Sequence, residues 1–570
     1  MMKLNYFTKP LLLVVILIAP CVVFSQESIK KHEKAYMHHE VMGDSYKPNA
    51  YGKAKTSPGY TFKGTSFFTT QVNVNSSGQN ILGDAANEPS LGINPKNPDQ
   101  MVIGWRQFDD VGNNFRQAGY GYSTDGGETW TFPGVIDQGV FRSDPVLDTD
   151  SSGVFYYNSL TKDAGNNYTC QVFRSYDGGV TWDAGTYAQG GDKQWMVIDK
   201  SGGMGDGNIY AFWTYYYSIC NPGAFTRSTN KGDSFEDCVT LDGQPHWGTL
   251  AVGPDGELYT VGANDFGGIV VTKSMIAQDP LYPVSWDFTS EVNLDGQLTG
   301  WSTVNPEGLI GQANIVVDNS EGQSRGNVYV LASVTRASNF DPADVMFARS
   351  SDGGVTWSEP VRINNDQNET NYQWFGTMSV APDGRIDVIW LDTRDNIPGF
   401  TNSALYYSSS FDQGTTWTEN LKLSELFDSQ VGWPNQSKMG DYYHMISTNN
   451  AAHFAWANTL NGEQDVYYGR VTIETIGNEE LTAAGKSLGF SAFPNPFGEK
   501  TNLQYTLPQA GNVSLTLCDV YGNVVKTLIN EFQTAGLHKY TLASEVPAAG
   551  LYYCRLSSGN SSTIKVVIIK

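Results

Sequence analysis

The sequence predicts an all-β protein: a β-propeller, with seven blades favoured and six possible, followed by a small C-terminal β-sandwich. Three observations predict it. A turn motif of the form Ser-x-Asp-x-Gly-x-Thr-Trp recurs along the chain. The 570 residues include 60 glycines and 13% aromatic residues, which suits short strands joined by tight turns. No sustained helical periodicity follows the first 30 residues, and a strand-rich repeat of this kind is typical of propellers.

The turn motif has a structural explanation. Ser and Asp side chains can bond to backbone groups a few residues on, Gly supplies positive φ, and Thr-Trp restarts an extended segment. The central acidic or amide residue of each copy is Asp125, Asp177, Asn230, Asp352 or Asp412, the Asn230 copy being degenerate. We therefore expect these five residues to hold hairpins together and assign them no catalysis.

Each motif lies in a unit of four predicted strands. The units begin near residue 88 and end near residue 473, and the fourth has lost its motif, with Thr272 to Trp286 in its place. The last unit, Asp441 to Thr472, has only three strands. A strand at Phe67–Val74 is expected to complete it and close the ring, since a propeller protects its strand edges in this way. Six blades remain if one unit is an insertion.

The ends of the chain differ from the repeat. Lys3, an apolar run at Leu11–Ile18 and Ser25 predict a signal peptide over residues 1–25, too short to span a membrane. Cys21 raises a lipoprotein alternative, which Pro20 fits poorly. Residues 26–65 are predicted to be a loose polar lead-in, 66–473 the propeller, 474–490 a linker and 491–570 a small antiparallel sandwich.

Charge and cysteines narrow the functional classes. The net charge of −23 argues against a nucleic-acid partner. No cofactor or metal is expected: Asp148–Gly153 resembles a calcium loop, but its twelfth position is Ser159 rather than Glu. We expect a monomer.

Disulfides are expected within the pairs Cys220 and Cys238, and Cys518 and Cys554, with buried free thiols as the alternative.

Two resemblances add to this. The turn motifs resemble the Asp-box (BNR) repeats of the sialidase-like propeller superfamily, over roughly residues 66–473. Such repeats are specific for the fold and not for activity, and the Arg-Ile-Pro segment expected of a sialidase is missing. The tail resembles the C-terminal sorting domain of proteins exported by the type IX secretion system of Bacteroidetes, in Pro494–Pro496, Asp519–Gly522, Ala549–Tyr552 and Lys565–Lys570. It implies type IX machinery as a partner, and secretion or display at the cell surface.

The site is expected on the face opposite the turn motifs. First strands begin there and second strands end there, and we call it the first-strand face; the opposite one is the turn face. Candidate catalytic residues are Asp144, Asp441, His246, His444 and Tyr443. Candidate substrate-binding residues are Glu88, Arg106, Lys193, Trp195, Arg336, Trp374, Asp392 and Arg394. Aromatic rings can stack on a sugar, arginine can hold an anionic group, and two carboxylates can act as acid and base.

Three functions fit this set. The leading hypothesis is hydrolysis of an extracellular glycan, with Asp144 or Asp441 as acid or base and with Arg106 and Arg394 holding an anionic group. The first alternative is a lyase acting on uronate-containing glycans, in which His246 or His444 acts with Tyr443. The second is a surface protein that binds a glycan or a protein without catalysis.

Overall fold

The computed structural model describes residues 44–47, 55–396 and 401–473, and in the C-terminal part 490–493, 495, 497, 500–507, 509–518, 524–543, 550–558 and 561–569. It divides into two compact units, Met1–Thr472 and Ile473–Lys570. The predicted signal peptide, most of the lead-in and almost all of the linker lie outside the described residues.

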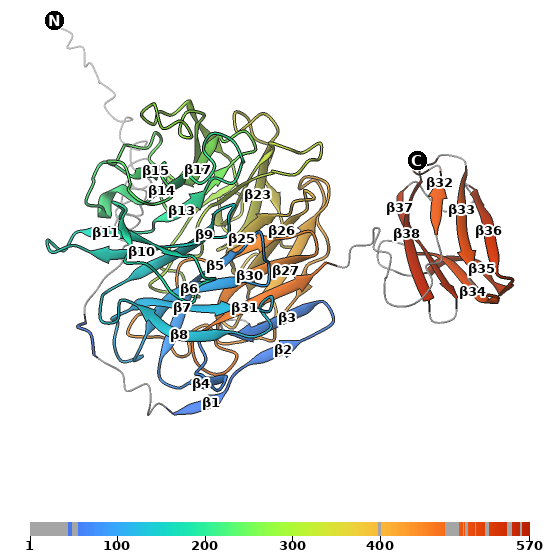
Figure 1. Ribbon diagram of the computed structural model, residues 1–570, viewed down its shortest axis with the longest axis horizontal. Helices are drawn as coiled ribbons and strands as arrows, with labels where there is room; N and C mark the ends of the chain where they lie inside the picture. The colour runs from blue at the N-terminus through green and yellow to red at the C-terminus, as the bar shows by residue number, and fades with distance from the viewer. Residues whose placement is uncertain are drawn as a thin grey trace, which may run out of the picture. The chain divides into compact units, whose positions relative to one another are not determined.

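The first unit contains seven antiparallel blade sheets, as the repeat predicts (Figure 1). Blade 1 comprises β5 (Ala85–Ile93), β6 (Met101–Phe108), β7 (Gln117–Ser123) and β8 (Thr131–Ile136). Blade 2 comprises β9 (Ser143–Thr149), β10 (Phe155–Lys162), β11 (Tyr168–Ser175) and β12 (Thr186–Tyr187). Blade 3 comprises β13 (Trp195–Ile198), β14 (Ile209–Phe212) and β15 (Phe225–Ser228), with the 3-10 helix η2 (Tyr215–Tyr217) after β14. A single bridge between Phe225 and Val239 stands in place of its fourth strand.

The remaining blades follow the same order. Blade 4 comprises β16 (Leu250–Val252), β17 (Leu258–Ala263), β18 (Ile269–Ser274) and β19 (Phe288–Val292). Blade 5 comprises β21 (Asn314–Val317), β22 (Val328–Arg336), β23 (Asp344–Ser350) and β24 (Val361–Arg362), with β20 (Gly296–Gln297) added to β22. Blade 6 comprises β25 (Gln373–Val380), β26 (Ile386–Asp392), β27 (Ala404–Ser410) and β28 (Leu421–Lys422). Blade 7 comprises β29 (His444–Ser447), β30 (Ala451–Asn458) and β31 (Asp465–Thr472).

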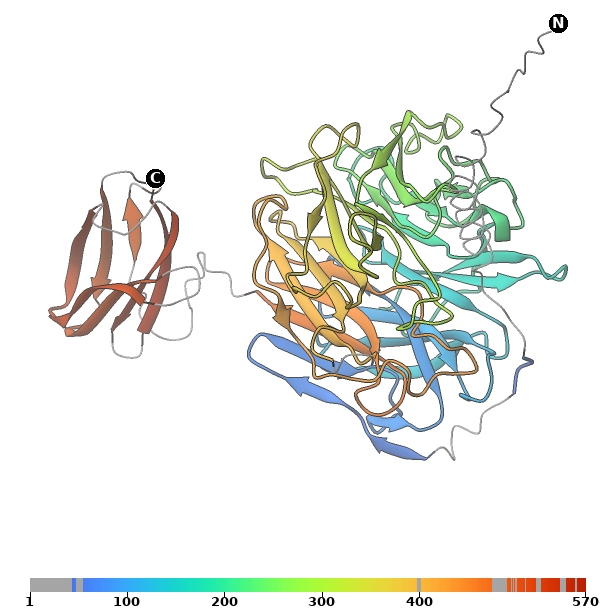
Figure 2. The same ribbon diagram turned by 180° about the vertical axis from the view of Figure 1, so that it is seen from behind.

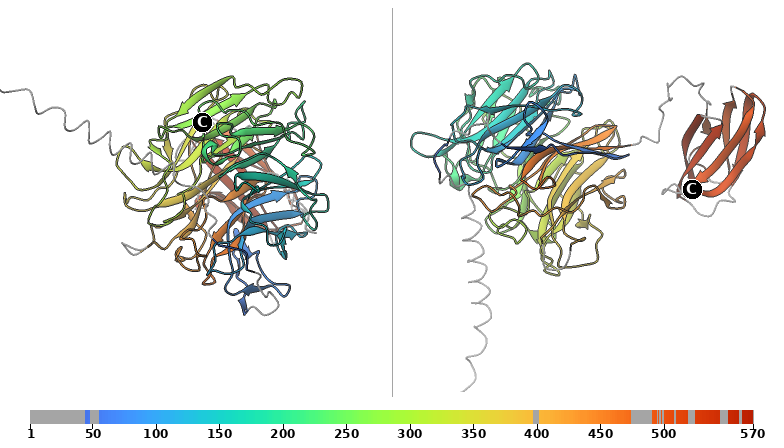
Figure 3. Two further views of the ribbon diagram at one scale, coloured as in Figure 1. Left: turned by 90° about the vertical axis from the view of Figure 1, so that its left-hand side faces the viewer. Right: turned by 90° about the horizontal axis from the view of Figure 1, so that it is seen from below.

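The ring closes through the start of the chain. Strand β3 (Phe67–Gln71) pairs antiparallel with β31, and Thr69 Oγ1 donates to the Tyr468 carbonyl at 2.8 Å. Figures 2 and 3 show these early strands, in blue, beside the last strands of the propeller, in orange. The predicted closing strand is therefore confirmed.

The predicted loose lead-in is wrong where it is described. β2 (Thr61–Lys63) extends the closing sheet beyond β3, and β1 (Thr56–Pro58) pairs with β4 (Gln79–Ile81). These three-residue strands are too short for a visible alternation, and partners elsewhere in the chain hold them in place.

The hydrophobic core lies between the blades. The innermost strands contact each other in a closed series, β5, β9, β13, β16, β21, β25, β29 and again β5. Because each blade packs against a neighbour on both sides, inner strands are buried on both faces, and every residue of β6 is buried. This explains why strands such as Met101–Phe108 show an almost continuous apolar run instead of alternation.

The recurrent turns lie between third and fourth strands. In the Asp352 copy, Ser350 Oγ donates to Asp352 Oδ1 at 2.7 Å and accepts the Gly354 N–H at 2.8 Å. The Thr356 N–H and hydroxyl donate to the two Asp352 oxygens at 2.9 and 2.6 Å. Gly353 and Gly354 have φ of 72° and 90°, which favours glycine. Equivalent bonds form around the other motif residues, Asp125, Asp177, Asn230 and Asp412.

Replacing one of these aspartates should cost stability. We expect Asp352→Ala to lower the free energy of unfolding by about 1–2 kcal/mol, because four donors, the Val355 N–H included, lose their acceptor at an exposed site. Urea unfolding followed by tryptophan fluorescence measures it. The matched control is Ser351→Ala in the same turn, which is exposed and expected to change stability by less than about 0.5 kcal/mol. Equal losses for both variants would contradict the role of the aspartate.

The second unit has two antiparallel sheets (Figure 1). One comprises β32 (Ser491–Phe493), β33 (Lys500–Leu507) and β36 (Gly536–Ala543); the other comprises β35 (Val524–Gln533), β34 (Gly511–Cys518), β37 (Gly550–Ser558) and β38 (Ser561–Ile569). Their shared core includes Leu503, Tyr505, Leu515 and Leu556. Among the tail motifs noted in the sequence, Pro494, Pro496, residues 519–522, Ala549 and Lys570 lie outside the described residues.

One of the two expected disulfides forms. Cys220 and Cys238 are bonded, whereas Cys518 and Cys554 are free and buried, as is Cys170. The register explains the error. Cys554 lies opposite Leu517, and Cys518 lies opposite Tyr553, so the two thiols are not cross-strand partners.

Candidate functional site

The first-strand face carries a ring of unusual backbone conformations. The innermost strand of every blade is preceded or entered by a residue with positive φ: Glu88 (51°), Asp144 (47°), Lys193 (57°), Trp247 (57°), Gly311 (139°), Phe375 (56°) and Gly440 (102°). Five of the seven are not glycine, and this region costs a side chain-bearing residue about 1–3 kcal/mol unless its surroundings hold it. Three of the predicted site residues, and the direct sequence neighbours of three others, therefore share one backbone feature.

Charged residues of this ring meet in a buried network. Asp441 Oδ2 accepts from Lys193 Nζ at 2.7 Å and from Lys438 Nζ at 3.0 Å. Glu88 contacts Lys438 Nζ at 3.4 Å and Arg106 Nε at 3.2 Å. All five side chains are at most 4% exposed. The structure thus brings together four predicted site residues and adds Lys438, which sequence analysis missed.

Asp144 lies in the same region, and both of its carboxylate oxygens accept hydrogen bonds. Its Oδ2 accepts the backbone N–H of Lys193 at 2.8 Å, and its Oδ1 accepts the Ser143 hydroxyl at 2.8 Å. Because both oxygens are engaged in a fully buried site, Asp144 holds the positive-φ backbone of the next blade. Asp144 and Asp441, both expected as catalytic residues, are fully buried.

Two long connections cover the network. The segment 298–312 lies between blades 4 and 5, and the segment 427–440 lies between blades 6 and 7. They meet where Met439 N–H donates to Asn305 Oδ1 at 2.8 Å and Asn305 Nδ2 donates to the Gly440 carbonyl at 2.7 Å. The Leu309 N–H donates to Asp441 Oδ1 at 2.8 Å. These contacts explain why the central carboxylates have no exposed surface.

The protonation of buried carboxyls predicts a pH dependence. Burial raises the pKa of Glu88 to about 8, against the lowering effect of Arg106 and Lys438. Burial also raises the pKa of Asp341 and of Asp465 to about 7. Unfolded carboxyl groups titrate near pH 4, so the stability these groups contribute is complete below about pH 4 and is lost as the pH rises through their folded values.

We therefore expect the melting temperature to fall between pH 6.5 and 8. His444 and His453, whose pKa burial lowers to about 4, act in the opposite direction only below about pH 6.5. Thermal unfolding followed by circular dichroism at constant ionic strength measures the effect. Asp341→Asn should make the fall shallower, and a melting temperature that rises from pH 6.5 to 8 would contradict the assignment.

The predicted histidines and Tyr443 do not form a proton-transfer set. His444 Nδ1 lies 3.0 Å from Ser90 Oγ and accepts the Leu91 N–H at 3.2 Å, and its ring packs on Trp195. The Tyr443 hydroxyl donates to the Ala457 carbonyl at 2.5 Å, and burial holds its pKa well above the usual value. His246 belongs to blade 4, beside Trp247. The three side chains therefore have separate surroundings, and none is shown contacting another.

The two predicted tryptophans are buried. Trp374 is fully buried and donates its indole N–H to Ser403 Oγ at 3.1 Å, so it is a packing residue and is not available to a ligand. Trp195 lies with Phe375, Tyr442 and Tyr443 around a gap too small to hold a water molecule. Their expected role as exposed stacking platforms is not supported by this placement.

The predicted arginines are paired. Arg336 binds Asp295 and Asp344, each at 2.5 Å. Arg394 binds Asp392 at 2.7 Å and Asn365 Oδ1 at 2.7 Å, and its guanidinium lies 4.5 Å from the Tyr406 ring centre. Arg106, described above, has Glu88. Each arginine thus has a carboxylate partner of its own.

An open pocket lies beside Arg394 on the first-strand face. Its volume is about 660 Å³, and it is lined by Asp366, Gln367, Asn368, Glu369, Thr370, Asn371, Arg394 and Asp395. Most of these belong to the connection between blades 5 and 6. Sequence analysis missed them because a polar loop with no motif gives no signal of a site.

Aromatic side chains on the same face were also missed. Phe266, Trp301 and Phe340 are 89, 41 and 84% exposed, and they lie in connections of blades 4 and 5. Tyr215, in contrast, was expected on this face after a predicted second strand; its ring centre lies 3.8 Å from that of Tyr216, and the two rings are tilted by 38°. Single aromatic residues in loops carry no periodic pattern, so only their exposure in the structure identifies them.

The described residues offer neither a grouped set of metal ligands nor a membrane-spanning helix. In the part of the chain that the structure describes, no three His, Cys, Asp or Glu side chains are grouped so that they could hold a metal ion. Within the same residues, no helix has the length and apolar character needed to cross a membrane.

Comparison with known proteins identifies the tail. Residues 491–570 match the family described as "Secretion system C-terminal sorting domain". This match confirms the resemblance seen in the sequence, and it indicates that the protein is exported to the cell surface or secreted. No curated protein matches the chain.

Solved structures similar to the propeller have low sequence identity. A protein of unknown function from Dyadobacter fermentans is 13% identical, with a TM-score of 0.40, 72% of this chain and 99% of that chain being covered. A Hadza microbial sialidase is 11% identical, with a TM-score of 0.37 and coverage of 68% and 66%. An ulvan lyase of polysaccharide lyase family PL25 is 10% identical, with a TM-score of 0.36 and coverage of 69% and 97%.

Proposed function

We propose that this protein is an exported β-propeller that binds an extracellular glycan on its first-strand face. The observation that carries the proposal is the open pocket of about 660 Å³ beside Arg394. Its amide, hydroxyl and carboxylate side chains offer both donors and acceptors, which is the chemistry that sugar hydroxyl groups require. Export through the sorting tail would bring this face into contact with extracellular glycans.

The test is retention on immobilised glycans. The full chain is passed over a panel of neutral, sulfated, sialylated and uronate-containing glycans. The variant Glu369→Ala/Asn371→Ala should weaken retention on the glycan that the unmodified protein binds by about tenfold or more, because two pocket side chains are removed. Glu359→Ala, an exposed residue after a turn motif, is the control. No retention on any glycan would overturn the proposal.

Glycosidic bond cleavage is the second candidate, and the Glu88 and Asp441 carboxyls favour it. Burial raises the pKa of Glu88 to about 8, which suits a proton donor, while Asp441 accepts from two lysine side chains. Two carboxyls in different environments are what acid–base hydrolysis uses. Since both are fully buried, the connections 298–312 and 427–440 would have to open first.

A turnover assay distinguishes the two candidates. Reducing ends report hydrolysis, and unsaturated products report elimination by the lyase route. A glycan-binding protein releases neither, whereas a hydrolase releases reducing ends that Glu88→Gln abolishes. Turnover that survives Glu88→Gln would exclude Glu88 as the acid.

A further inference from the structure

The geometry points to a disulfide-braced subsite for a neutral sugar residue, formed by Tyr216, Asp265 and Phe266 between blades 3 and 4. The subsite lies on the first-strand face, away from the pocket beside Arg394, and it rests on the proposed function.

The centre of the subsite is the Asp265 carboxylate. The hydroxyls of Tyr215 and Tyr216 both donate to its Oδ2, each at 2.8 Å. This joins the end of β14 in blade 3 to the turn after β17 in blade 4. Oδ1 of Asp265 is covered and has no hydrogen-bond partner. A covered carboxylate oxygen without a donor is costly, and a sugar hydroxyl would supply that donor once the half-buried Tyr216 side chain gives way.

Phe266 provides an aromatic platform next to that carboxylate. Its side chain is 89% exposed, although its backbone is held firmly. Asn264 Oδ1 accepts the N–H groups of Phe266 and Gly268, at 2.9 and 3.0 Å, in a tight turn. An exposed ring on an ordered turn loses little conformational entropy when a flat, apolar sugar face stacks on it.

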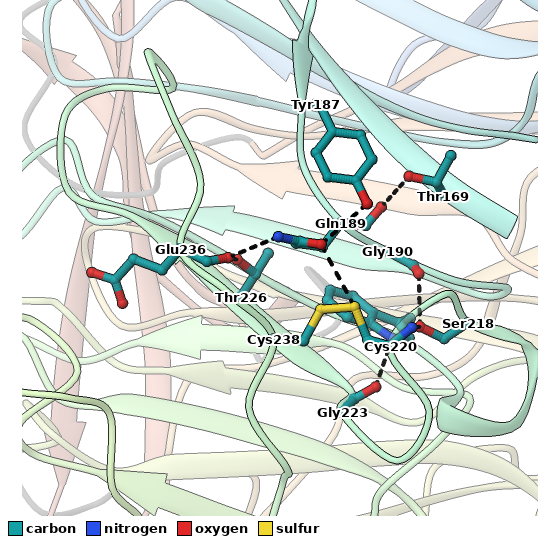
Figure 4. Close-up of a disulfide and its surroundings, with 11 residues drawn as sticks. Thr169, Tyr187, Gln189, Gly190, Ser218, Cys220, Gly223, Thr226, Glu236 and Cys238 are labelled. Carbon is teal, nitrogen blue, oxygen red and sulfur yellow. Dashed lines mark hydrogen bonds between the residues drawn. A yellow bond between two sulfur atoms is a disulfide. The ribbon is translucent and has the colours of Figure 1, made fainter. Parts of the chain in front are cut away.

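A disulfide between Cys220 and Cys238, drawn in Figure 4, lies in the loop that follows the two tyrosines. Cys220 lies three residues after η2, and its bond to Cys238 ties the tyrosine loop to the segment that follows β15. Nearby, the Cys220 N–H donates to Ser218 Oγ at 3.0 Å, and that hydroxyl donates to the Gly190 carbonyl at 2.8 Å. An exported protein meets oxidising conditions in which such a bond persists. The bond therefore restrains Tyr215 and Tyr216 before a ligand arrives.

The charge of the subsite selects the ligand class. Among the described residues, no lysine or arginine pairs with Asp265, so its negative charge is not neutralised. Arg336 and Arg394, two of the arginines of this face, already have carboxylate partners, as does Arg106. A sulfated, sialylated or uronate-containing sugar would bring a second negative charge beside Asp265, which is unfavourable at short range. A neutral sugar avoids that repulsion, and this replaces the expectation that arginines hold an anionic group.

Affinity electrophoresis of the oxidised full chain tests the subsite. Gels contain the neutral polysaccharides mannan or laminarin, or the anionic polysaccharides alginate or chondroitin sulfate. We expect retardation in a neutral gel only. Phe266→Ala should raise the apparent Kd about tenfold, the size of one lost aromatic contact, without changing the melting temperature. The matched control is Phe411→Ala, since Phe411 is 67% exposed in a turn motif on the opposite face.

The outcomes separate this inference from the proposed function. Retardation in anionic gels alone would overturn the neutral class and leave glycan binding intact. Retardation in a neutral gel that Phe266→Ala and Tyr216→Phe leave unchanged would overturn the subsite, while the pocket variants could still lose binding. The Cys220→Ser/Cys238→Ser variant should weaken binding as well, because the tyrosine loop loses its restraint. Absence of retardation in every gel, together with no retention on the glycan panel, would overturn the proposed function itself.

Discussion

A chain that begins at Asn75 is expected to lose its folded propeller, whereas a chain that begins at Lys55 should keep it. The shorter chain lacks β3, all five residues of which are buried. Phe67 and Phe68 are 6 and 5% exposed, and burying two such rings contributes about 3–6 kcal/mol. That is a large part of the 5–15 kcal/mol by which folded domains are usually stable. The edge of β31 would also be left open to association with other chains.

Near-ultraviolet circular dichroism and size-exclusion chromatography measure this outcome. The chain from Lys55 is the control because it retains β1, β2 and β3. A cooperative thermal transition and a monomeric elution volume for the chain from Asn75 would show that the seventh blade does not need its strand from the start of the chain.

Asp441→Ala is expected to lower the free energy of unfolding by about 3–5 kcal/mol, because removing one partner leaves buried charges uncompensated. Asp441 holds Lys193 at 2.7 Å and Lys438 at 3.0 Å, and it accepts the Leu309 N–H from the covering segment. The substitution therefore affects blades 3 and 7 and the cover of the axis together. Urea unfolding followed by intrinsic fluorescence measures the loss.

The control for this variant is Asp110→Ala. Asp110 is exposed in the turn after β6, and among the described residues its carboxylate accepts one local N–H, from Gly112, so its loss should cost about 0.5 kcal/mol or less. If Asp441→Ala is as stable as the control, the central network does not stabilise the propeller. The Glu88 and Asp441 carboxyls would then be better explained by catalysis.

The repeat made much of the propeller predictable. The spacing of the Ser-x-Asp turns indicated units of four strands, and the three-stranded last unit required a strand from elsewhere, which β3 supplies. The short strands β1 and β2 were not predictable, because a three-residue strand has no periodicity of its own. Their pairing partners β4 and β3 decide their structure.

The face on which the candidate site residues gather was predicted from the sequence, but their burial was not. Strand direction alone indicated that Glu88, Lys193 and Asp441 would gather on one face, and they do meet in one network. Whether that network opens to solvent depends on the segments 298–312 and 427–440, which belong to no repeat. Their contacts through Asn305 cover the axis.

For Asp265 and Phe266, the sequence did not indicate the contacts between blades. Asp265 and Phe266 follow a predicted strand, yet nothing in their spacing indicates that two tyrosines from another blade share the Asp265 carboxylate. Likewise, cysteine spacing allowed both expected disulfides. In the register of β34 against β37, Cys518 and Cys554 do not lie opposite each other. The second expected disulfide therefore does not form.

The sequence by itself determined the blade repeat, the closing strand, the face on which the innermost strands begin and the sorting tail, because each is encoded in residues close together or in a fixed period. Only the tertiary structure decided which side chains on that face are accessible. Burial and pairing depend on contacts between blades and between non-repeating connections. Those contacts buried Asp144, Asp441 and Trp374, and left Phe266 and the pocket beside Arg394 open to solvent.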